Sequence, residues 1–286
     1  MGWGGASPHR TDVLKPAPTR QPAAAPSSAP LLSVQDLFIA FGGIVALDGV
    51  SLQVPAGALI SVIGPNGAGK TTLFNCITGL YRPDRGRIVF AGRSLASAKP
   101  DRVARLGIAR TFQNVELFLR MTTLENLLLG RHLHFRSGLL AAALGLPRWR
   151  REEVAHRERA EQILDFLDLQ EARDRRVGDL PLGRQRLVEL GRALATDPKL
   201  LLLDEPSSGM TSEEKADLVF RIKDIREEME ITVILVEHDL KLVMGISDWI
   251  AVLDHGVKIA QGNAAEVQAN PEVIRAYLGE PDGTSG

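Results

Sequence analysis

Short apolar runs recur along this chain, and several of them are continuous rather than alternating with polar residues. Continuous apolar runs are typical of strands that are buried on both faces of a parallel sheet. Three such runs occupy residues 59–64, 199–203 and 232–237, and the last two each follow a helical segment. This alternation of strand and helix predicts an α/β fold with a mostly parallel sheet.

The pattern predicts further short elements in the N-terminal third of the chain. Runs rich in β-forming residues lie at 32–38, 49–54 and 87–90. A Gly-rich turn follows the continuous run that ends at residue 64, and a helix is expected from Lys70 to about Leu80. Strand, turn and helix in this order form one half of a βαβ unit.

The middle of the chain, residues 114–185, has a different pattern. Residues 121–129 and 148–169 repeat with a helical period, and the second segment is dense in Arg and Glu. No convincing strand lies between them. We therefore predict a helical insertion here, which divides one α/β core into residues 31–113 and 186–280.

An apolar stretch at 138–146 interrupts this insertion and is flanked by His and Arg residues. A helix needs about 20 apolar residues to span a bilayer, so this stretch is too short to do so. Two interpretations stay open. The stretch is either a buried hairpin of the insertion or an exposed surface that faces a membrane-embedded partner and lipid head groups.

Composition and charge narrow the class of protein. The 286 residues are 44% hydrophobic and 24% charged, which is ordinary for a soluble globular protein. The formal net charge of −1 argues against a nucleic-acid partner, which would normally require a basic excess. The single cysteine, Cys76, excludes an intrachain disulfide. Residues 1–30, with six of the sixteen prolines, are predicted to be a disordered tail rather than a signal peptide.

The clearest chemical signal is the segment Gly64-Pro-Asn-Gly-Ala-Gly-Lys-Thr71. It matches G-x-x-x-x-G-K-[ST] between an apolar strand and a helix, the context that identifies a P-loop. Glycines let backbone N–H groups approach phosphates, and the helix N-terminus adds partial positive charge. Lys70 is expected to meet the β- and γ-phosphates, and the Thr71 hydroxyl to ligate Mg²⁺. The predicted nucleotide contacts are Asn66, Gly67, Ala68, Gly69, Lys70, Thr71 and Thr72.

Two carboxylates follow directly after the apolar run at 199–203. Asp204 and Glu205 stand where ligands bind in open α/β sheets, at the C-terminal end of a strand. Alone, such carboxylates are often only turn residues. Together with the P-loop, they predict Asp204 as a contact of the Mg²⁺ shell and Glu205 as the group that orients or deprotonates the attacking water.

Additional motifs complete the pattern: Phe41-Gly-Gly, Arg110-Thr-Phe-Gln113, Asp204-Glu-Pro206, Glu237-His-Asp239 running on to Asp248, and residues 270–279. With these, the chain from Leu32 to Glu280 resembles the ATP-binding subunits of ABC transporters, and among them those of branched-chain amino-acid importers. The resemblance implies ATP and Mg²⁺ as ligands. It also implies a P-loop NTPase core with an antiparallel β subdomain and an inserted helical subdomain.

The resemblance assigns roles that the residues alone do not reveal. Phe41 matches the aromatic residue that stacks on adenine, although an aromatic beside two glycines is more often a core residue. Gln113 matches a glutamine that contacts Mg²⁺ and water, and its simpler interpretation is a polar loop residue. His238 matches the histidine that contacts the γ-phosphate, whereas a lone histidine there would more often be structural.

Subunits of this family pack head to tail, so that each ATP is closed by the signature segment of the partner. That segment corresponds to residues 179–185. Relative to Leu-Ser-Gly-Gly-Gln it keeps Gly183 but carries Pro181, Leu182 and Arg184. The missing serine removes a hydroxyl donor, and proline has no N–H. The helix N-terminus at Gly183 and the charge of Arg184 are predicted to offset that loss, or Arg184 faces water or an acidic neighbour.

The resemblance implies an ATP-hydrolysing motor subunit of a membrane importer, bound peripherally at the cytoplasmic face of the inner membrane. The expected solutes are branched-chain or other small polar amino acids. Implied partners are integral-membrane permease subunits, a second ATP-binding subunit (the same chain or a paralogue) and, indirectly, a periplasmic or extracellular solute-binding protein. Two alternatives stay open: a soluble ABC ATPase with a role outside transport, and a catalytically weak regulatory subunit that binds ATP.

Overall fold

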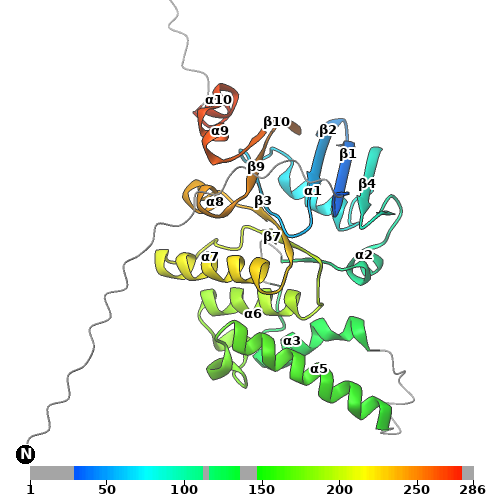
Figure 1. Ribbon diagram of the computed structural model, residues 1–286, viewed down its shortest axis with the longest axis vertical. Coiled ribbons are helices and arrows are strands. Elements are labelled where there is room, and N and C mark those ends of the chain that lie inside the picture. The colour runs from blue at the N-terminus through cyan, green and yellow to red at the C-terminus, as the bar shows by residue number, and fades with distance from the viewer. Residues whose placement is uncertain (1–28, 112–115, 136–146, 279–286) are drawn as a thin grey trace, which may run out of the picture.

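The computed structural model describes residues 29–111, 116–135 and 147–278. Its core is a sheet of six strands: β3 (Leu59–Ile63), β6 (Ile108–Arg110), β7 (Leu200–Asp204), β8 (Thr232–Val236), β9 (Trp249–Asp254) and β10 (Val257–Gly262). Their order is β10-β9-β3-β8-β7-β6 (Figure 1). The pairs from β9 to β6 are parallel, and β10 joins β9 antiparallel. The predicted mostly parallel sheet is confirmed.

The continuous apolar runs form the centre of this sheet. Every residue of β3, β7 and β8 is buried, as expected for strands covered on both faces. In the register, Ile60 and Leu202 flank Ile234 from the two sides. Because the three strands are parallel, the loops that follow them meet at one edge of the sheet. That edge carries the P-loop and the two strand-end carboxylates.

A second, antiparallel sheet contains β1 (Leu32–Phe41), β2 (Ile44–Val54), β4 (Arg85–Phe90) and β5 (Arg93–Ser94), in the order β2-β1-β4-β5. It confirms the antiparallel β subdomain that the resemblance implied. Its apolar face shares one hydrophobic cluster with the helix after the P-loop, in which Phe74 and Phe90 are fully buried. The antiparallel sheet therefore supports the P-loop helix from one side (Figure 1).

The helix after the P-loop, α1 (Lys70–Ile77), ends earlier than the predicted Leu80. Thr78 caps it, and Gly79 takes a left-handed φ of 76°, a conformation that commonly terminates helices. The other helices around the core are α2 (Pro100–Leu106), α7 (Ser212–Glu227), α8 (Leu240–Ile246), α9 (Ala264–Ala269) and α10 (Pro271–Leu278).

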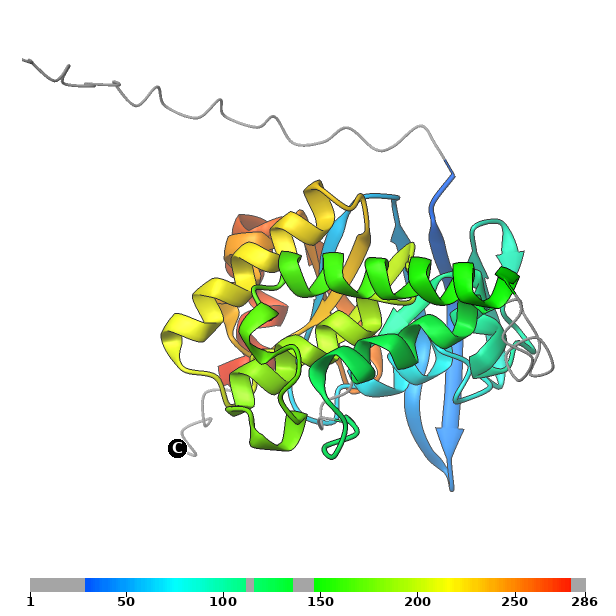
Figure 2. The ribbon, with the colours of Figure 1, turned by 90° about the horizontal axis from the view of Figure 1, so that it is seen from below.

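The middle of the chain is helical where the structure describes it. It contains α3 (Thr123–Arg131), η1 (His132–His134), α5 (Pro147–Phe166), η2 (Gln170–Ala172), η3 (Val177–Asp179) and α6 (Leu182–Leu194). These helices lie at the opposite end of the molecule from α9 and α10 (Figure 1), and α5 extends alongside α3 (Figure 2). Leu127, Ile163 and Leu190 share one hydrophobic cluster with Leu201 and Leu235 of the parallel sheet. The hydrophobic cluster therefore continues from the parallel sheet into the helices of the predicted insertion.

Two predicted segments fall on residues that the structure leaves undescribed: nearly all of the tail 1–30 and the apolar stretch 138–146. Among the described helices, none combines the length and the apolar character needed to cross a bilayer.

Candidate functional site

The P-loop surrounds its own lysine. The Lys70 ammonium donates to the carbonyl oxygens of Gly64 at 2.7 Å and Pro65 at 2.9 Å. Burial lowers the pKa of Lys70, and the negative charges of Glu205 and Asp204 oppose that shift. The predicted phosphate-binding lysine and the predicted strand-end carboxylates therefore share one electrostatic environment.

Three P-loop glycines differ in what surrounds them. A Cβ atom on Gly64 would lie 2.1 Å from the carbonyl oxygen of Leu253, and one on Gly69 would lie 2.6 Å from the carbonyl oxygen of Ala46. A Cβ atom on Gly67 would meet nothing within 4 Å. The outer two glycines are therefore required by packing against the fold itself, whereas Gly67 belongs to the open face of the loop.

The predicted water-activating carboxylate and the predicted histidine meet directly. His238 Nε2 lies 2.8 Å from Glu205 Oε1, although the two residues come from the loops after β8 and β7. Glu205 has a φ of 50°, a left-handed conformation that is uncommon for a residue with a side chain. Its backbone N–H donates to the carbonyl oxygen of Val236 at 2.8 Å, which fixes the carboxylate at the edge of the sheet.

Asp204 has one carboxylate oxygen bound by the protein and one available. Its Oδ2 atom accepts from Arg110 Nη2 at 2.7 Å. Its Oδ1 atom is buried and has no hydrogen-bond partner within the described part of the chain. A buried carboxylate oxygen of this kind suits a divalent cation, and the Thr71 hydroxyl at the start of α1 would supply a second oxygen of the type that Mg²⁺ prefers. These residues fit the predicted magnesium site.

Sequence reasoning missed two side chains that organise this edge. Glu237 is 3% exposed, and its carboxylate accepts from the backbone N–H groups of Ser207 and His238. It thereby connects the loop after Glu205 with the loop that holds the histidine. Arg110 binds Asp204, as described above. Both residues lie inside motifs quoted for the resemblance, but only the fold shows what they contact.

The predicted adenine-stacking residue, Phe41, lies at the end of β1 and is 45% exposed. Its ring meets that of Tyr81 edge to face, with 5.1 Å between the centroids. Tyr81 belongs to the loop after α1, and Asp84 of that loop accepts from the backbone N–H of Ala40 at 3.0 Å. An exposed aromatic platform is therefore fixed next to the P-loop helix. Gln113, the remaining predicted contact of the cation, lies outside the described residues.

The signature segment forms the start of α6, one residue earlier than predicted. Pro181 is the N-cap, so the free N–H groups of the first turn begin at Leu182. A Cβ atom on Gly183 would lie 2.1 Å from Glu214 Oε1. Arg184 donates to the backbone carbonyl oxygen of Asp168 in its own subunit. A side chain at position 183 would therefore displace the Glu214 carboxylate, and Arg184 already has a partner.

Thr211 caps α7. Its hydroxyl accepts from the N–H of Glu214, and the Glu214 carboxylate accepts from the N–H of Thr211 at 2.8 Å. This capping box places the Glu214 carboxylate against Gly183. The first turn of α7 and the signature segment are thus in direct contact within one subunit.

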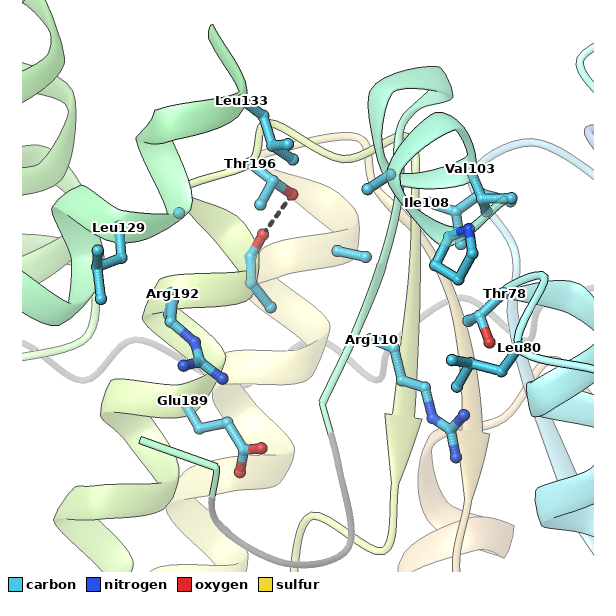
Figure 3. A pocket seen from close by; sticks show the side chains of 15 residues that line it. Thr78, Leu80, Val103, Ile108, Arg110, Leu129, Leu133, Glu189, Arg192 and Thr196 are labelled. Carbon is cyan, nitrogen blue, oxygen red and sulfur yellow. Dashed lines mark hydrogen bonds between the residues drawn. The ribbon is translucent and has the colours of Figure 1, made fainter. Parts of the chain in front are cut away.

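A groove of about 370 Å³ opens between α2, β6, α3 and α6 (Figure 3). Leu129, Leu133 and Val103 give it an apolar lining, and Glu189 and Arg192 lie along one wall. Arg110 lines the same groove. The groove therefore begins at the side chain that binds Asp204 and extends to the middle helices.

Comparison with known families decides the identity. The family model described as "ABC transporter" matches residues 47–208, which is more than half of the chain. The chain belongs to the ABC transporter ATP-binding family. A second model, described as "Branched-chain amino acid ATP-binding cassette transporter", matches residues 257–283 of this ABC ATPase. The predicted activity, ATP hydrolysis by a subunit of an ABC transporter, agrees with this membership.

Curated relatives match the ABC ATPase along nearly their whole length. The high-affinity branched-chain amino acid transport ATP-binding protein BraF of Pseudomonas aeruginosa is 45% identical, over 88% of this chain and 99% of BraF. The corresponding LivG protein of Escherichia coli K12 is 43% identical over the same shares. The subfamily resemblance stated from the motifs is confirmed.

Solved structures confirm the fold of the ABC ATPase. A nucleotide-free ATP-binding cassette from an ABC transporter superposes with a TM-score of 0.76 at 36% identity, covering 87% of this chain and 99% of that one. A dimeric ABC transporter cassette superposes with a TM-score of 0.69 at 25% identity, covering 82% and 98%.

Proposed function

We propose that this ABC ATPase drives the import of branched-chain amino acids or, alternatively, of small polar amino acids. The observation that carries the proposal is the 43–45% identity along nearly the full length of relatives named as high-affinity branched-chain amino acid transport ATP-binding proteins. The C-terminal match to the branched-chain transporter model supports the same solute class. The ATPase acts at the cytoplasmic face of the inner membrane, bound peripherally to its partners.

ATP binds along the carboxyl edge of the parallel sheet. Backbone N–H groups of residues 66–72 receive the phosphates, Lys70 exchanges its two carbonyl contacts for phosphate oxygens, and Phe41 stacks on the adenine. Thr71, Asp204 and Gln113 hold Mg²⁺, which when bound neutralises charge on the phosphates.

Hydrolysis depends on the pair at the ends of β7 and β8. Glu205 orients the attacking water and accepts its proton, because its carboxylate lies at the edge where the phosphates end. His238, 2.8 Å from that carboxylate, holds it in place and contacts the γ-phosphate. The left-handed backbone at Glu205 and the buried Glu237 keep the two loops in register.

A second ATP-binding subunit, either the same chain or a paralogue, completes each site. The first turn of α6 presents backbone N–H groups at Leu182 and Gly183 to the γ-phosphate bound by the partner. Arg184 adds a positive charge there once it leaves the carbonyl oxygen of Asp168. The dimeric form of a structural relative supports this arrangement.

Integral-membrane permease subunits dock in the groove between α2, α3 and α6. The groove is apolar along Leu129 and Leu133 and charged at Glu189 and Arg192, which suits a short amphipathic segment. A solute-binding protein outside the membrane delivers the amino acid to the permeases and does not touch this chain.

Co-expression with the permeases tests the proposal. The ATPase is expected to co-purify with them, and proteoliposomes containing the complex and the solute-binding protein are expected to accumulate leucine, isoleucine and valine in the presence of ATP. Leu133→Asp, in the groove, is expected to abolish co-purification, whereas Phe220→Asp on the exposed face of α7 is a control outside the groove. An ATPase that never associates with permeases would refute the proposal.

A further inference from the structure

A buried ion pair joins Asp204, the predicted magnesium ligand (the magnesium carboxylate), to Arg110, which lines the groove between α2, α3 and α6. Arg110 Nη2 lies 2.7 Å from Asp204 Oδ2, and the two side chains are 6% and 2% exposed. Arg110 Nη1 donates to Asn75 Oδ1 of α1 at 2.6 Å. The guanidinium carbon lies 5.5 Å from the centroid of the Phe74 ring. One side chain from β6 therefore binds both the strand that ends in Asp204 and the P-loop helix.

This geometry leaves Asp204 prepared for a cation. Arg110 binds Oδ2, while Oδ1 is buried with no hydrogen-bond partner within the described residues. A planar guanidinium that bridges two acceptors fixes the orientation of the carboxylate more firmly than a point charge can. Groups that hold a ligating carboxylate from behind determine how well it binds its metal.

The other end of the contact is the groove. Arg110 lines it together with Leu129 and Arg192, so a segment that fills the groove packs against the same side chain that holds Asp204 (Figure 3). Arg110 also stands two residues before Phe112, at the start of the segment that carries Gln113.

We propose that Arg110 is a positioning residue for the magnesium carboxylate, and that it transmits the occupancy of the groove to the nucleotide site. A docked permease segment holds the guanidinium on Asp204 and Asn75 and thereby strengthens cation binding. The part about transmission rests on the proposed docking of a permease in the groove. The part about Asp204 rests on the ion pair alone.

The first arm of the test uses the full-length ATPase and Mn²⁺ as the probe. The free Mn²⁺ signal in electron paramagnetic resonance is titrated in the presence of saturating ADP, so that no turnover is required. Arg110→Met is expected to weaken Mn²⁺ binding by about 10-fold or more, the usual consequence of losing a group that supports a metal ligand. Arg110→Lys keeps the charge but not the bridge, and is expected to recover part of the affinity.

Arg131→Lys is the matched control. The Arg131 side chain is similarly buried, at 8% exposed, and is ion-paired to an aspartate, Asp197, but it lies in the middle helices. Its substitution is expected to lower the urea midpoint without changing Mn²⁺ affinity. Mn²⁺ binding by Arg110→Met that equals or exceeds that of the wild type would overturn the positioning role. If this variant fails to fold, Arg110→Lys decides the same question.

The second arm compares the isolated ATPase with the permease complex. The wild-type complex is expected to bind Mn²⁺ several-fold more tightly than the isolated subunit, and the Arg110→Lys complex is expected to lose this difference. If the isolated wild-type subunit and the wild-type complex bind Mn²⁺ with equal affinity, the proposed transmission is overturned. The positioning role of Arg110 is then decided by the first arm alone. Permeases that do not bind the wild type would overturn the proposed function and the transmission together, whereas the first arm would still decide the role of Arg110.

Discussion

Gly64 begins the P-loop at a point where the backbone leaves no room for a side chain. Its φ is 151°, and an added Cβ atom would lie 2.1 Å from the carbonyl oxygen of Leu253, a backbone atom of the neighbouring strand β9. Gly64→Ala is therefore expected to separate β3 from β9. Overpacking of this kind costs about 1–3 kcal/mol, and the backbone conformation costs about 1–3 kcal/mol more.

The sum, about 2–6 kcal/mol, is a large part of the roughly 5–15 kcal/mol that stabilises a typical domain. Urea unfolding followed by circular dichroism, without nucleotide, measures it directly. Gly67→Ala in the same loop is the control, because its φ is 82° and a Cβ atom there would meet nothing within 4 Å. This control is expected to cost only about 1–2 kcal/mol.

The two variants also separate packing from ligand binding. Gly67 lies on the open face of the loop, so Gly67→Ala is expected to weaken the binding of a fluorescent ATP analogue more than it weakens the fold. Equal free energies of unfolding for the two variants, or a loss below about 1 kcal/mol for Gly64→Ala, would refute the argument that contact with β9 requires the first glycine.

Three further substitutions test the site. Glu205→Gln is expected to lower ATP turnover by about 10²–10⁴-fold, since an amide cannot accept the proton, while binding of the fluorescent ATP analogue changes little. Asp239→Ala is expected to cost about 1 kcal/mol at pH 7, because Asp239 caps α8 and accepts from Lys215. Lys215 lowers the pKa of Asp239 in the folded state, so this contribution is present above about pH 4 and declines as pH falls through the folded pKa; a cost that is constant in urea unfolding from pH 7 to pH 3 would contradict it. Arg184→Ala is expected to lower ATP turnover in the assembled transporter, and an unchanged turnover would show that Arg184 serves only its contact with Asp168.

The local pattern of apolar and polar residues was sufficient to predict the core of the fold and about half of the residues of the site. The continuous apolar runs became β3, β7 and β8 because strands buried on both faces have no polar positions. The P-loop was predictable because its glycines, Lys70 and Thr71 are adjacent in sequence. Asp204 and Glu205 were predictable because parallel strands bring their carboxyl ends to one edge.

Short elements and boundaries were less predictable. The strand β6 has only three residues, Ile108–Arg110, and its pairing with β7 rather than its own pattern makes it a strand. The helix α1 ends at Ile77 because Gly79 forms a left-handed turn, which the helical period of the preceding residues does not reveal.

The sequence by itself determined which chemical groups this ATPase carries and on which element each one lies. The tertiary structure alone decided their partners. Arg110 meets Asp204, His238 meets Glu205, and Glu214 packs against Gly183, each pair joining segments about 30 to 90 residues apart in sequence. The reason is that strand order, and not chain order, sets these distances, since β6, β7 and β8 become neighbours only when the sheet forms.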